Sequence, residues 1–499
     1  MAFSVVTRRA ILAIPPALLA STLPGIARAQ QRDRVVIGVS LTPPQLDPTS
    51  SDASIVGEVT LNNVLEGLTK ILENGKVAPL LAKSWSLSDD KLTMTFRLIK
   101  NARFHDGSAF DAQVVKFSIN RAQKLGLRNK SYETLYKNIS NVIVHDKYTV
   151  ALKLRHPDPL LTFRLGESPA VMVHPDSAHK LEHHPIGTGP YLFSSLVPDQ
   201  SLDLTRWPKF RDMDRVAIRH AQFRFLPSPD MQIKAIQNTE VDMLFHMSLQ
   251  GINHFNVSHH YQVLLGSTSS KMLVAINNRQ PPLDDIRVRQ ALSHAIDRSA
   301  FITEAFGGRG QGIGSHFVPT DPAYINQTSV YPYNPDKARQ LLEEAGVSTP
   351  LKLTLALPPT PYARAGGPVL KSLLSASGID LTLRHVTWKE WLQTVFRGKF
   401  DLSLIMHVEP FDYHIYARSN YYFGYDSPDY LELVTQYQHS TNPRERRALM
   451  HQIQRTLTDD AVNVWLLTPE MATITRKGLK GVWMDYPIFS HYIADMYWS

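Results

Sequence analysis

Strand-like runs alternate with stretches of helical periodicity along most of the chain. Residues 35–40 are apolar and largely β-branched, and residues 272–277 are apolar throughout most of their length, which favours buried strands. Apolar and polar residues alternate over 92–98, as expected for a strand with one buried face. After residue 284 the apolar side chains instead recur every three or four positions, which predicts an amphipathic helix.

The second half of the chain repeats this alternation with clear boundary signals. Asn334 can cap a helix that has Pro335 in its first turn, and Gly346 can end that helix in a left-handed conformation. The segments that follow are predicted as strands over 351–357 and 379–386 and as helices over 369–377 and 388–396. Strands that alternate with helices indicate an open α/β sheet.

One run near mid-chain resembles a known family. It reads N-x-x-x-P-P-x-x-D-x-R-V-R-Q-A-x-x-x-A-I-D-R from Asn277 to Arg298, and either Asp284 or Asp285 can cap its helix. The run is similar to the central block of the extracellular solute-binding proteins of family 5, the peptide-, nickel- and oligosaccharide-binding components of ABC importers. Further blocks of the same resemblance are Leu46-Asp47-Pro48, Glu66-Gly67-Leu68, Phe104-His105-Asp106-Gly107, Ile186 to Tyr191, and 333–346. A glycine of the family is replaced by Thr239 in this chain.

The resemblance implies a mixed α/β, two-lobed periplasmic binding protein fold. It is the type II fold of the larger members, which carry an inserted extra domain and hold the ligand in a cleft between the lobes. The expected divisions are a first lobe of 30–76, 185–270 and 478–499, an inserted domain of 77–184, and a second lobe of 271–477. We expect the lobes to close by a hinge motion near 268–277 and 470–482.

Residues 1–29 have the features of a targeting segment. Arg8 and Arg9 precede an apolar stretch, and Ala27-Arg28-Ala29 offers small residues for cleavage before Gln30. Both the twin-arginine route and the general secretory route fit these residues. The chain contains no cysteine, so we expect no lipoprotein anchor and a location in the periplasm.

Charge and motif content exclude several other functions. The net charge of +8 is modest for 499 residues, and the basic residues form no stripe with exposed aromatics, so nucleic acid is not an expected partner. The glycines of 307–314 lack dinucleotide-binding spacing, and the loop 186–191 lacks the lysine of a P-loop. No nucleophile–base or metalloprotease motif is present either, so an enzyme is not expected. The resemblance implies a monomeric binding protein, for which we predict no cofactor and no resident metal.

The function that the resemblance implies is capture of short peptides or peptide-like solutes for delivery to a membrane-embedded ABC permease. A nickel chelate, an opine or an oligosaccharide remains an alternative ligand class on the same fold. A sensory or chaperone-like role without transport is a further alternative.

Two stretches are candidates for ligand binding. Arg364 lies just after a predicted strand, and the resemblance implies that it pairs with a ligand carboxylate. In the second stretch, Asp412 and Tyr413 keep the acid–tyrosine order of the peptide-binding relatives, and the resemblance implies that the acid holds the ligand's α-ammonium. Glu409 is the competing acid of this stretch. His407 stands where relatives often have an aromatic residue, and either His407 or His414 would be a candidate in the nickel-binding alternative.

Overall fold

The computed structural model describes residues 32–51, 53–125, 135–247, 259–321, 323–440 and 442–499. Residues 33–499 form one compact unit. The predicted targeting segment lies outside the described residues. Among the helices of the described ranges, none has both the length and the apolar character that a membrane span requires.

The first large sheet has seven strands and is built from segments far apart in the sequence. Its strand order is β12-β19-β11-β1-β10-β9-β8. The central strand β1 runs parallel to both of its neighbours, and the remaining pairs are antiparallel. The strands are β1 (Arg34–Val39), β8 (Tyr191–Val197), β9 (Ser201–Arg206), β10 (His220–Phe225), β11 (Met243–Met247), β12 (Tyr261–Gly266) and β19 (Met471–Arg476).

The second large sheet has six strands in the order β14-β18-β13-β17-β15-β16. Its strands are β13 (Lys271–Ile276), β14 (Gln311–Gly312), β15 (Leu351–Leu357), β16 (Ile379–His385), β17 (Leu402–His407) and β18 (Val464–Thr468). Both faces of β13 are buried because its side chains alternate between two apolar clusters. Met272 and Val274 pack with one set of helices, whereas Leu273 and Ala275 pack with the aromatic residues on the opposite face.

A third sheet of four antiparallel strands, in the order β4-β5-β7-β6, has its own apolar core. Its strands are β4 (Ala82–Leu87), β5 (Thr93–Leu98), β6 (Ile139–Asp146) and β7 (Thr149–Leu154). Two further pairs are formed by β2 (Thr69–Ile71) with β3 (Val77–Pro79) and by β20 (Leu479–Lys480) with β21 (Tyr497–Trp498). The four-stranded sheet lies within the predicted inserted domain, whose boundaries stay a prediction.

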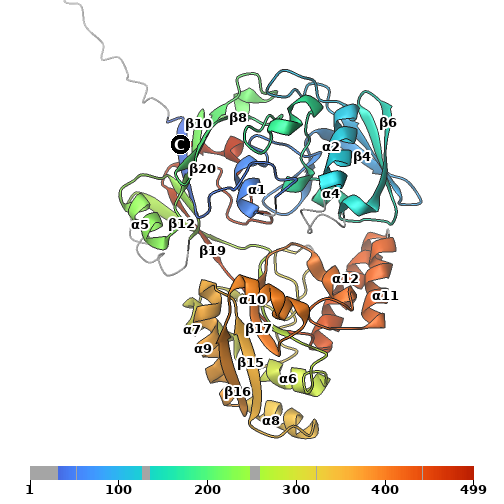
Figure 1. Cartoon of the computed structure of the whole chain (residues 1–499), viewed down its shortest axis with the longest axis vertical. Helices are drawn as coiled ribbons and strands as arrows, with labels where there is room; N and C mark the ends of the chain where they lie inside the picture. The colour runs from blue at the N-terminus through green and yellow to red at the C-terminus, as the bar shows by residue number, and fades with distance from the viewer. Residues whose placement is uncertain (1–31, 52, 126–134, 248–258, 322, 441) are drawn as a thin grey trace, which may run out of the picture. The chain divides into compact units, whose positions relative to one another are not determined.

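Helices cover these sheets, and Figure 1 shows α7 and α9 alongside the six-stranded sheet and α2 beside the four-stranded one. The α-helices are α1 (Ser54–Thr60), α2 (Ala112–Leu125), α4 (Leu161–Arg164), α5 (Pro229–Gln237), α6 (Ile286–His294), α7 (Arg298–Phe306), α8 (Pro335–Glu344), α9 (Pro361–Ser375), α10 (Trp388–Gln393), α11 (Pro428–His439) and α12 (Pro443–Asp459). The short 3₁₀ turns are η1 (Ser168–Ala170), η2 (Pro175–Lys180), η3 (Met213–Arg215), η5 (Val395–Arg397), η6 (Asp412–Ala417) and η7 (Ile493–Asp495).

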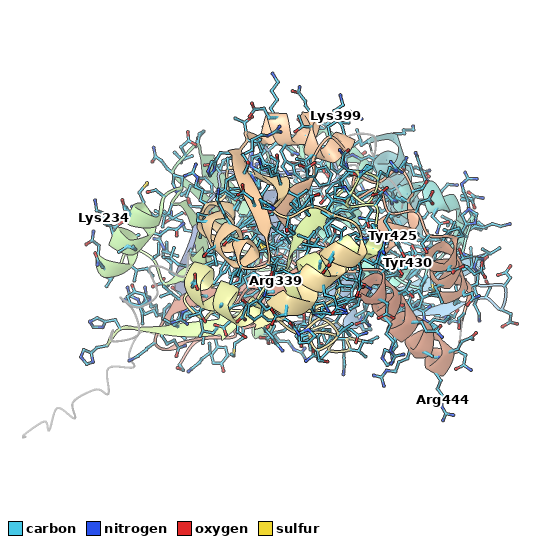
Figure 2. The ribbon with its side chains drawn as sticks, turned by 90° about the horizontal axis from the view of Figure 1, so that it is seen from below. Lys234, Arg339, Lys399, Tyr425, Tyr430 and Arg444 are labelled. Carbon is cyan, nitrogen blue, oxygen red and sulfur yellow. The ribbon has the colours of Figure 1, made fainter. Side chains whose placement is uncertain are left out.

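The side chains sort as expected for a folded unit of this size. Lys234, Lys399 and Arg444 are exposed and project outward in Figure 2, whereas Tyr425 and Tyr430 are buried. Charged groups are thereby kept in water, and the aromatic residues of the second half supply packing area.

The chain passes between the seven-stranded and six-stranded sheets twice. One crossing is the segment 267–270, between β12 and β13, and the other is 469–470, between β18 and β19. Each crossing overlaps one of the two segments predicted as hinges, 268–277 and 470–482. The hinge motion itself stays a prediction.

Several local signals predicted the structure closely. Asn334 caps α8 by accepting from the backbone N–H of Lys337, and Gly346 follows that helix with a φ of 73°. Asp285 is the acid that caps α6, where it accepts from the backbone N–H of Arg287. The predicted strand over 351–357 coincides with β15.

Other boundaries differ from the prediction. Residues 55–68, which have helical character in the sequence, are helical only as far as Thr60, because Asn62 takes a left-handed conformation with a φ of 58°. The amphipathic helix predicted after residue 284 ends at His294, and Asp297 caps a new helix by accepting from the N–H groups of Ser299 and Ala300. The left-handed turn at Asn62 and the cap of Asp297 therefore override the apolar periodicity at these places.

Candidate functional site

A cavity of about 620 Å³ lies between the end of β17 and the residues around α1 and α4. The strand β17 ends in it, and the loop 408–411 and the turn η6 continue along its wall. Its other walls come from the start of α1, from residues 160–169 around α4, from α10 and η5, and from 487–489. A volume of this size suits a ligand as large as a peptide of a few residues.

Aromatic side chains form much of the wall. Trp388 and Phe396 line the cavity and are 45% and 43% exposed, which is unusual for such large apolar groups. Phe163 of α4 meets Phe411 edge to face, with ring centroids 5.1 Å apart. The cavity therefore offers apolar surface to a ligand at several positions.

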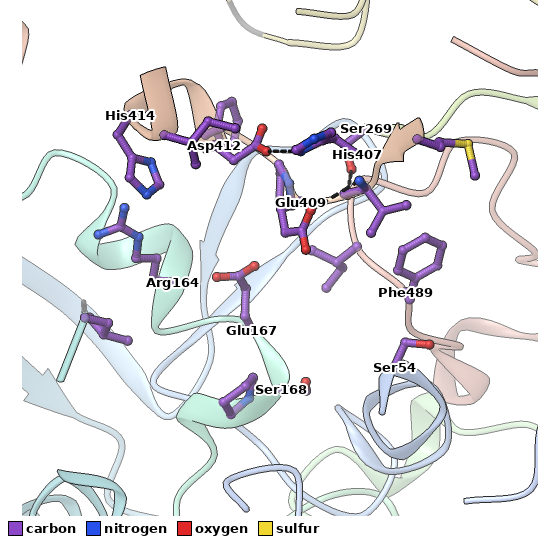
Figure 3. Close-up of a pocket in the computed structure, with 18 of the residues that line it drawn as sticks. Ser54, Arg164, Glu167, Ser168, Ser269, His407, Glu409, Asp412, His414 and Phe489 are labelled. Atoms are coloured by element: carbon purple, nitrogen blue, oxygen red, sulfur yellow. Dashed lines mark hydrogen bonds and ion pairs between the residues drawn. The ribbon is translucent and has the colours of Figure 1, made fainter. Parts of the chain in front are cut away.

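Two glutamate side chains line the same cavity. Glu409 is exposed, and its carboxylate accepts a hydrogen bond from the backbone N–H of Val408 at 3.3 Å. Glu167 lies between α4 and η1 and also lines the cavity. Figure 3 shows both carboxylates turned toward the interior of the cavity. Both side chains bring carboxylate oxygens to the wall of the cavity.

Asp412, in contrast, is already paired within the protein. Its Oδ1 lies 2.9 Å from Nζ of Lys271 and 2.7 Å from Nε2 of His316, and its Oδ2 lies 3.2 Å from Nδ1 of His407. Burial alone would raise the pKa of Asp412, but His316 and Lys271 outweigh that effect and hold the pKa well below its usual range. Asp412 is therefore a buried carboxylate with a resident counter-ion.

The two histidines of this cluster are hydrogen-bonded at both ring nitrogens. Burial lowers the pKa of His316 to about 4 in spite of the neighbouring carboxylate. His316 donates from Nε2 to Asp412 and accepts at Nδ1 from the hydroxyl of Tyr416, 3.0 Å away. Nδ1 of His407 donates to Asp412, and its Nε2 lies 3.1 Å from the hydroxyl of Tyr422. Both nitrogens of each ring thus have a partner.

The backbone places Asp412 in this position. Phe411, the residue before it, has a φ of 55°, a left-handed conformation that is costly for a bulky side chain. The turn that results points the carboxylate inward, toward Lys271 at the start of β13. Ser269 fixes the same loop by donating to the carbonyl oxygen of Val408 at 2.9 Å.

Cationic and imidazole groups also line the cavity. Arg164 is ion-paired with Asp158 at 2.8 Å, and Arg418 is exposed at the end of η6. His414 is half-buried, and burial together with Arg418 and Arg164 lowers its pKa to about 4. Figure 3 shows His414 close to Arg164. At neutral pH the imidazole is therefore uncharged.

The structure shows where three of the predicted site residues lie, and their roles in ligand binding stay predictions. Arg364 is exposed near the start of α9 and does not line the cavity, because the residues after β15 form the first turn of that helix. Tyr413 is buried against Phe317, with its ring centroid 6.0 Å away, and is part of the aromatic core. Asp412 is paired with Lys271, His316 and His407, and its predicted contact with a ligand amine stays a prediction.

His407 and Glu409 do line the cavity, as does Asp412 itself. Sequence reasoning missed Lys271 and His316, and it missed Glu167 together with Arg418. No local signal could have found Lys271, because its carboxylate partner is 141 positions away in the chain. A single lysine before an apolar strand is ordinarily a solvated strand end.

The comparisons with known proteins agree with this architecture. A structure of the ABC transporter substrate-binding protein CtaP from Listeria monocytogenes is similar to this fold, with a TM-score of 0.84 at 21% identity, covering 94% of this chain and 100% of that one. The fold is therefore the mixed α/β fold of periplasmic binding proteins, as predicted.

The sequence comparisons then show the family. Residues 76–429 match the family described as "Bacterial extracellular solute-binding proteins, family 5 Middle". This chain belongs to that family, which consists of binding proteins and not of enzymes.

Two curated relatives have similar sequences. The glutathione-binding protein GsiB of Salmonella paratyphi A is 27% identical over 341 residues, which are 68% of this chain and 66% of that protein. A putative ABC transporter peptide-binding protein of Brucella ovis is 29% identical over 333 residues, which are 64% of this chain and 62% of the relative. The matched region thus spans slightly less than two thirds of each relative.

Proposed function

We propose that this protein captures a short peptide or peptide-like solute in the cavity and delivers it, from the periplasm, to an ABC import permease. The observation that carries the proposal is the combination of two cavity-facing carboxylates, Glu409 and Glu167, with exposed aromatic walls. A peptide amine needs an anion once it leaves water, and its side chains gain from apolar contact.

In the proposed mode of binding, the ligand's ammonium lies between Glu409 and Glu167. Arg418 is the exposed guanidinium that can meet a carboxylate at the other end of the ligand. Trp388 and Phe396 contact the ligand's apolar side chains. The family and the relatives named for glutathione and for peptides support this ligand class.

The test is calorimetry with matched pairs of ligands. Glutathione and a set of di- and tripeptides with one aromatic side chain are each compared with the N-acetylated form. Acetylation removes the charge and keeps most of the shape. We expect it to weaken binding by about 1.5–3 kcal/mol, roughly 10- to 100-fold, as for the loss of a charged hydrogen-bonding group. Equal affinity within each pair would refute recognition through an amine.

A metal chelate is a second candidate, which His414 favours. Its imidazole lines the cavity and is neutral at pH 7, so a nitrogen can bind a metal ion carried by a small chelator. Titration with nickel in the presence of free histidine tests this candidate. Binding that is lost in His414→Ala supports it, and absence of binding by the unchanged protein removes it.

A further inference from the structure

Three side chains on and behind the cavity wall, His316, His407 and Asp412, have the composition of a cation-binding site. Nitrogens of His316 and His407 and an oxygen of Asp412 lie within 4.8 Å of one another, and all three residues are buried. Two imidazoles and one carboxylate are a common ligand set for divalent transition metals. The same carboxylate, however, is 2.9 Å from the ammonium of Lys271.

We propose that Lys271 is a built-in occupant of this cation site, and that its ammonium excludes mobile cations from Asp412, His316 and His407. Lys271 is thereby a specificity-determining residue. It closes the Asp412 position to metal ions and to ligand amines, so an incoming ammonium has only the cavity carboxylates to bind.

The strand pairing explains how the lysine reaches the site. Lys271 is the first residue of β13 and is directly opposite His407, the last residue of β17, in an antiparallel pair. Residues opposite each other in such a pair extend their side chains on the same side of the sheet. Lys271 is the single charged residue in β13, and its side chain is only 2% exposed. A solvated strand-end lysine would be far more accessible.

The contacts of the ammonium resemble those of a bound ion. Lys271 donates to Oδ1 of Asp412 and, at 2.5 Å, to the backbone carbonyl of Glu409. The carboxylate also accepts from His316 and His407, whose remaining nitrogens accept from Tyr416 and Tyr422. The Asp412 carboxylate thus accepts hydrogen bonds from Lys271, His316 and His407.

The charges of the site also favour exclusion of a mobile cation. The Lys271 ammonium already balances the Asp412 carboxylate 2.9 Å away, so a mobile cation would add an uncompensated charge in a buried site. Without the ammonium, the site has one negative charge and two imidazoles, which a divalent ion can bind. This inference concerns the Asp412 cluster alone and stands whether or not the proposed ligand is correct.

The test is Co²⁺ binding, followed by its visible absorption, in the untagged full chain and in Lys271→Met. Methionine keeps the length and apolar stem of lysine and removes the charge. We expect the variant to bind Co²⁺ at least about tenfold more tightly than the unchanged protein, with a spectrum typical of nitrogen and oxygen ligands. The double variant Lys271→Met, Asp412→Asn is the matched control and should lose the gain.

Two results would overturn the proposal. One is tight Co²⁺ binding by the unchanged protein that His316→Ala abolishes, because the lysine would then not exclude the ion. The other is a Lys271→Met variant that folds normally and binds Co²⁺ no better than its control. If Lys271→Met is not recovered folded, it is refolded with and without Co²⁺. A larger folded fraction with the ion supports the proposal, and equal recovery contradicts it.

Discussion

The two acids of the loop after β17 should respond in opposite ways to neutralisation. Asp412→Asn leaves the Lys271 ammonium, 2.9 Å away and 2% exposed, without a counter-ion in a buried site. Removing one partner of a buried ion pair costs about 3–5 kcal/mol, so the ligand-free variant should lose that much stability. Glu409 is exposed and forms no ion pair within the described residues, so Glu409→Gln should change the free energy of unfolding by less than about 0.5 kcal/mol.

Ligand binding should show the reverse order. Glu409→Gln should weaken binding of a free-amine peptide by about 1.5–3 kcal/mol, because it removes a charged hydrogen-bonding partner. The assays are urea denaturation of the ligand-free proteins and calorimetry with one peptide. Asp412→Asn, measured below its unfolding transition, should retain most of the affinity. A stable Asp412→Asn variant that no longer binds the peptide, beside a Glu409→Gln variant that binds normally, would refute this reasoning and return the anchoring role to Asp412.

Three further predictions use other parts of the molecule. Glu58 lies 3.9 Å from the buried His491, and burial raises its pKa to about 7 from 4.5, so the contribution of Glu58 to stability should be fully present below about pH 4.5 and be lost as the pH rises to about 7. Glu58→Gln should remove this fall, worth up to about 3 kcal/mol near pH 8, in denaturation curves recorded across the range; an unchanged pH profile would contradict the assignment. Thr239 has a φ of 57° at the end of α5, so Thr239→Gly should stabilise the protein by about 1 kcal/mol, and lower stability would show that the strain is not there. Arg418→Ala should weaken binding of a peptide with a free carboxylate by about tenfold while Arg364→Ala leaves it unchanged, and the opposite result would restore the predicted role of Arg364.

Local structure could be predicted where a few adjacent residues decide it. Asn334, Pro335 and Gly346 define α8 within a single turn at each end, and the leucine-rich run 351–357 can be little else than a strand. Predictions that relied on periodicity alone were less accurate, as at Ala295, where Asp297 begins a new helix. A capping side chain has a specific hydrogen bond to offer, whereas an apolar stripe permits several endpoints.

The site could be predicted only in part, because its chemistry comes from contacts across the sequence. The loop after β17, a predicted ligand-binding stretch, lines the cavity, and its role in binding stays a prediction. Which acid is available to a ligand depends on Lys271 and His316, which are 141 and 96 positions from Asp412. Tyr413 follows an acid in the expected order, but its neighbours in the aromatic core bury it. Burial and long-range pairing of this kind have no signature in a short motif.

The most direct test of the proposed function is native mass spectrometry of the protein with an equimolar mixture of solutes. The protein is first unfolded and refolded to release any bound ligand. It is then equilibrated with short peptides, their N-acetylated forms, oligosaccharides and nickel–histidine. The account predicts a bound mass that matches free-amine peptides and that disappears in Glu409→Gln. A bound oligosaccharide, chelate or acetylated peptide, or no bound solute at all, would contradict it.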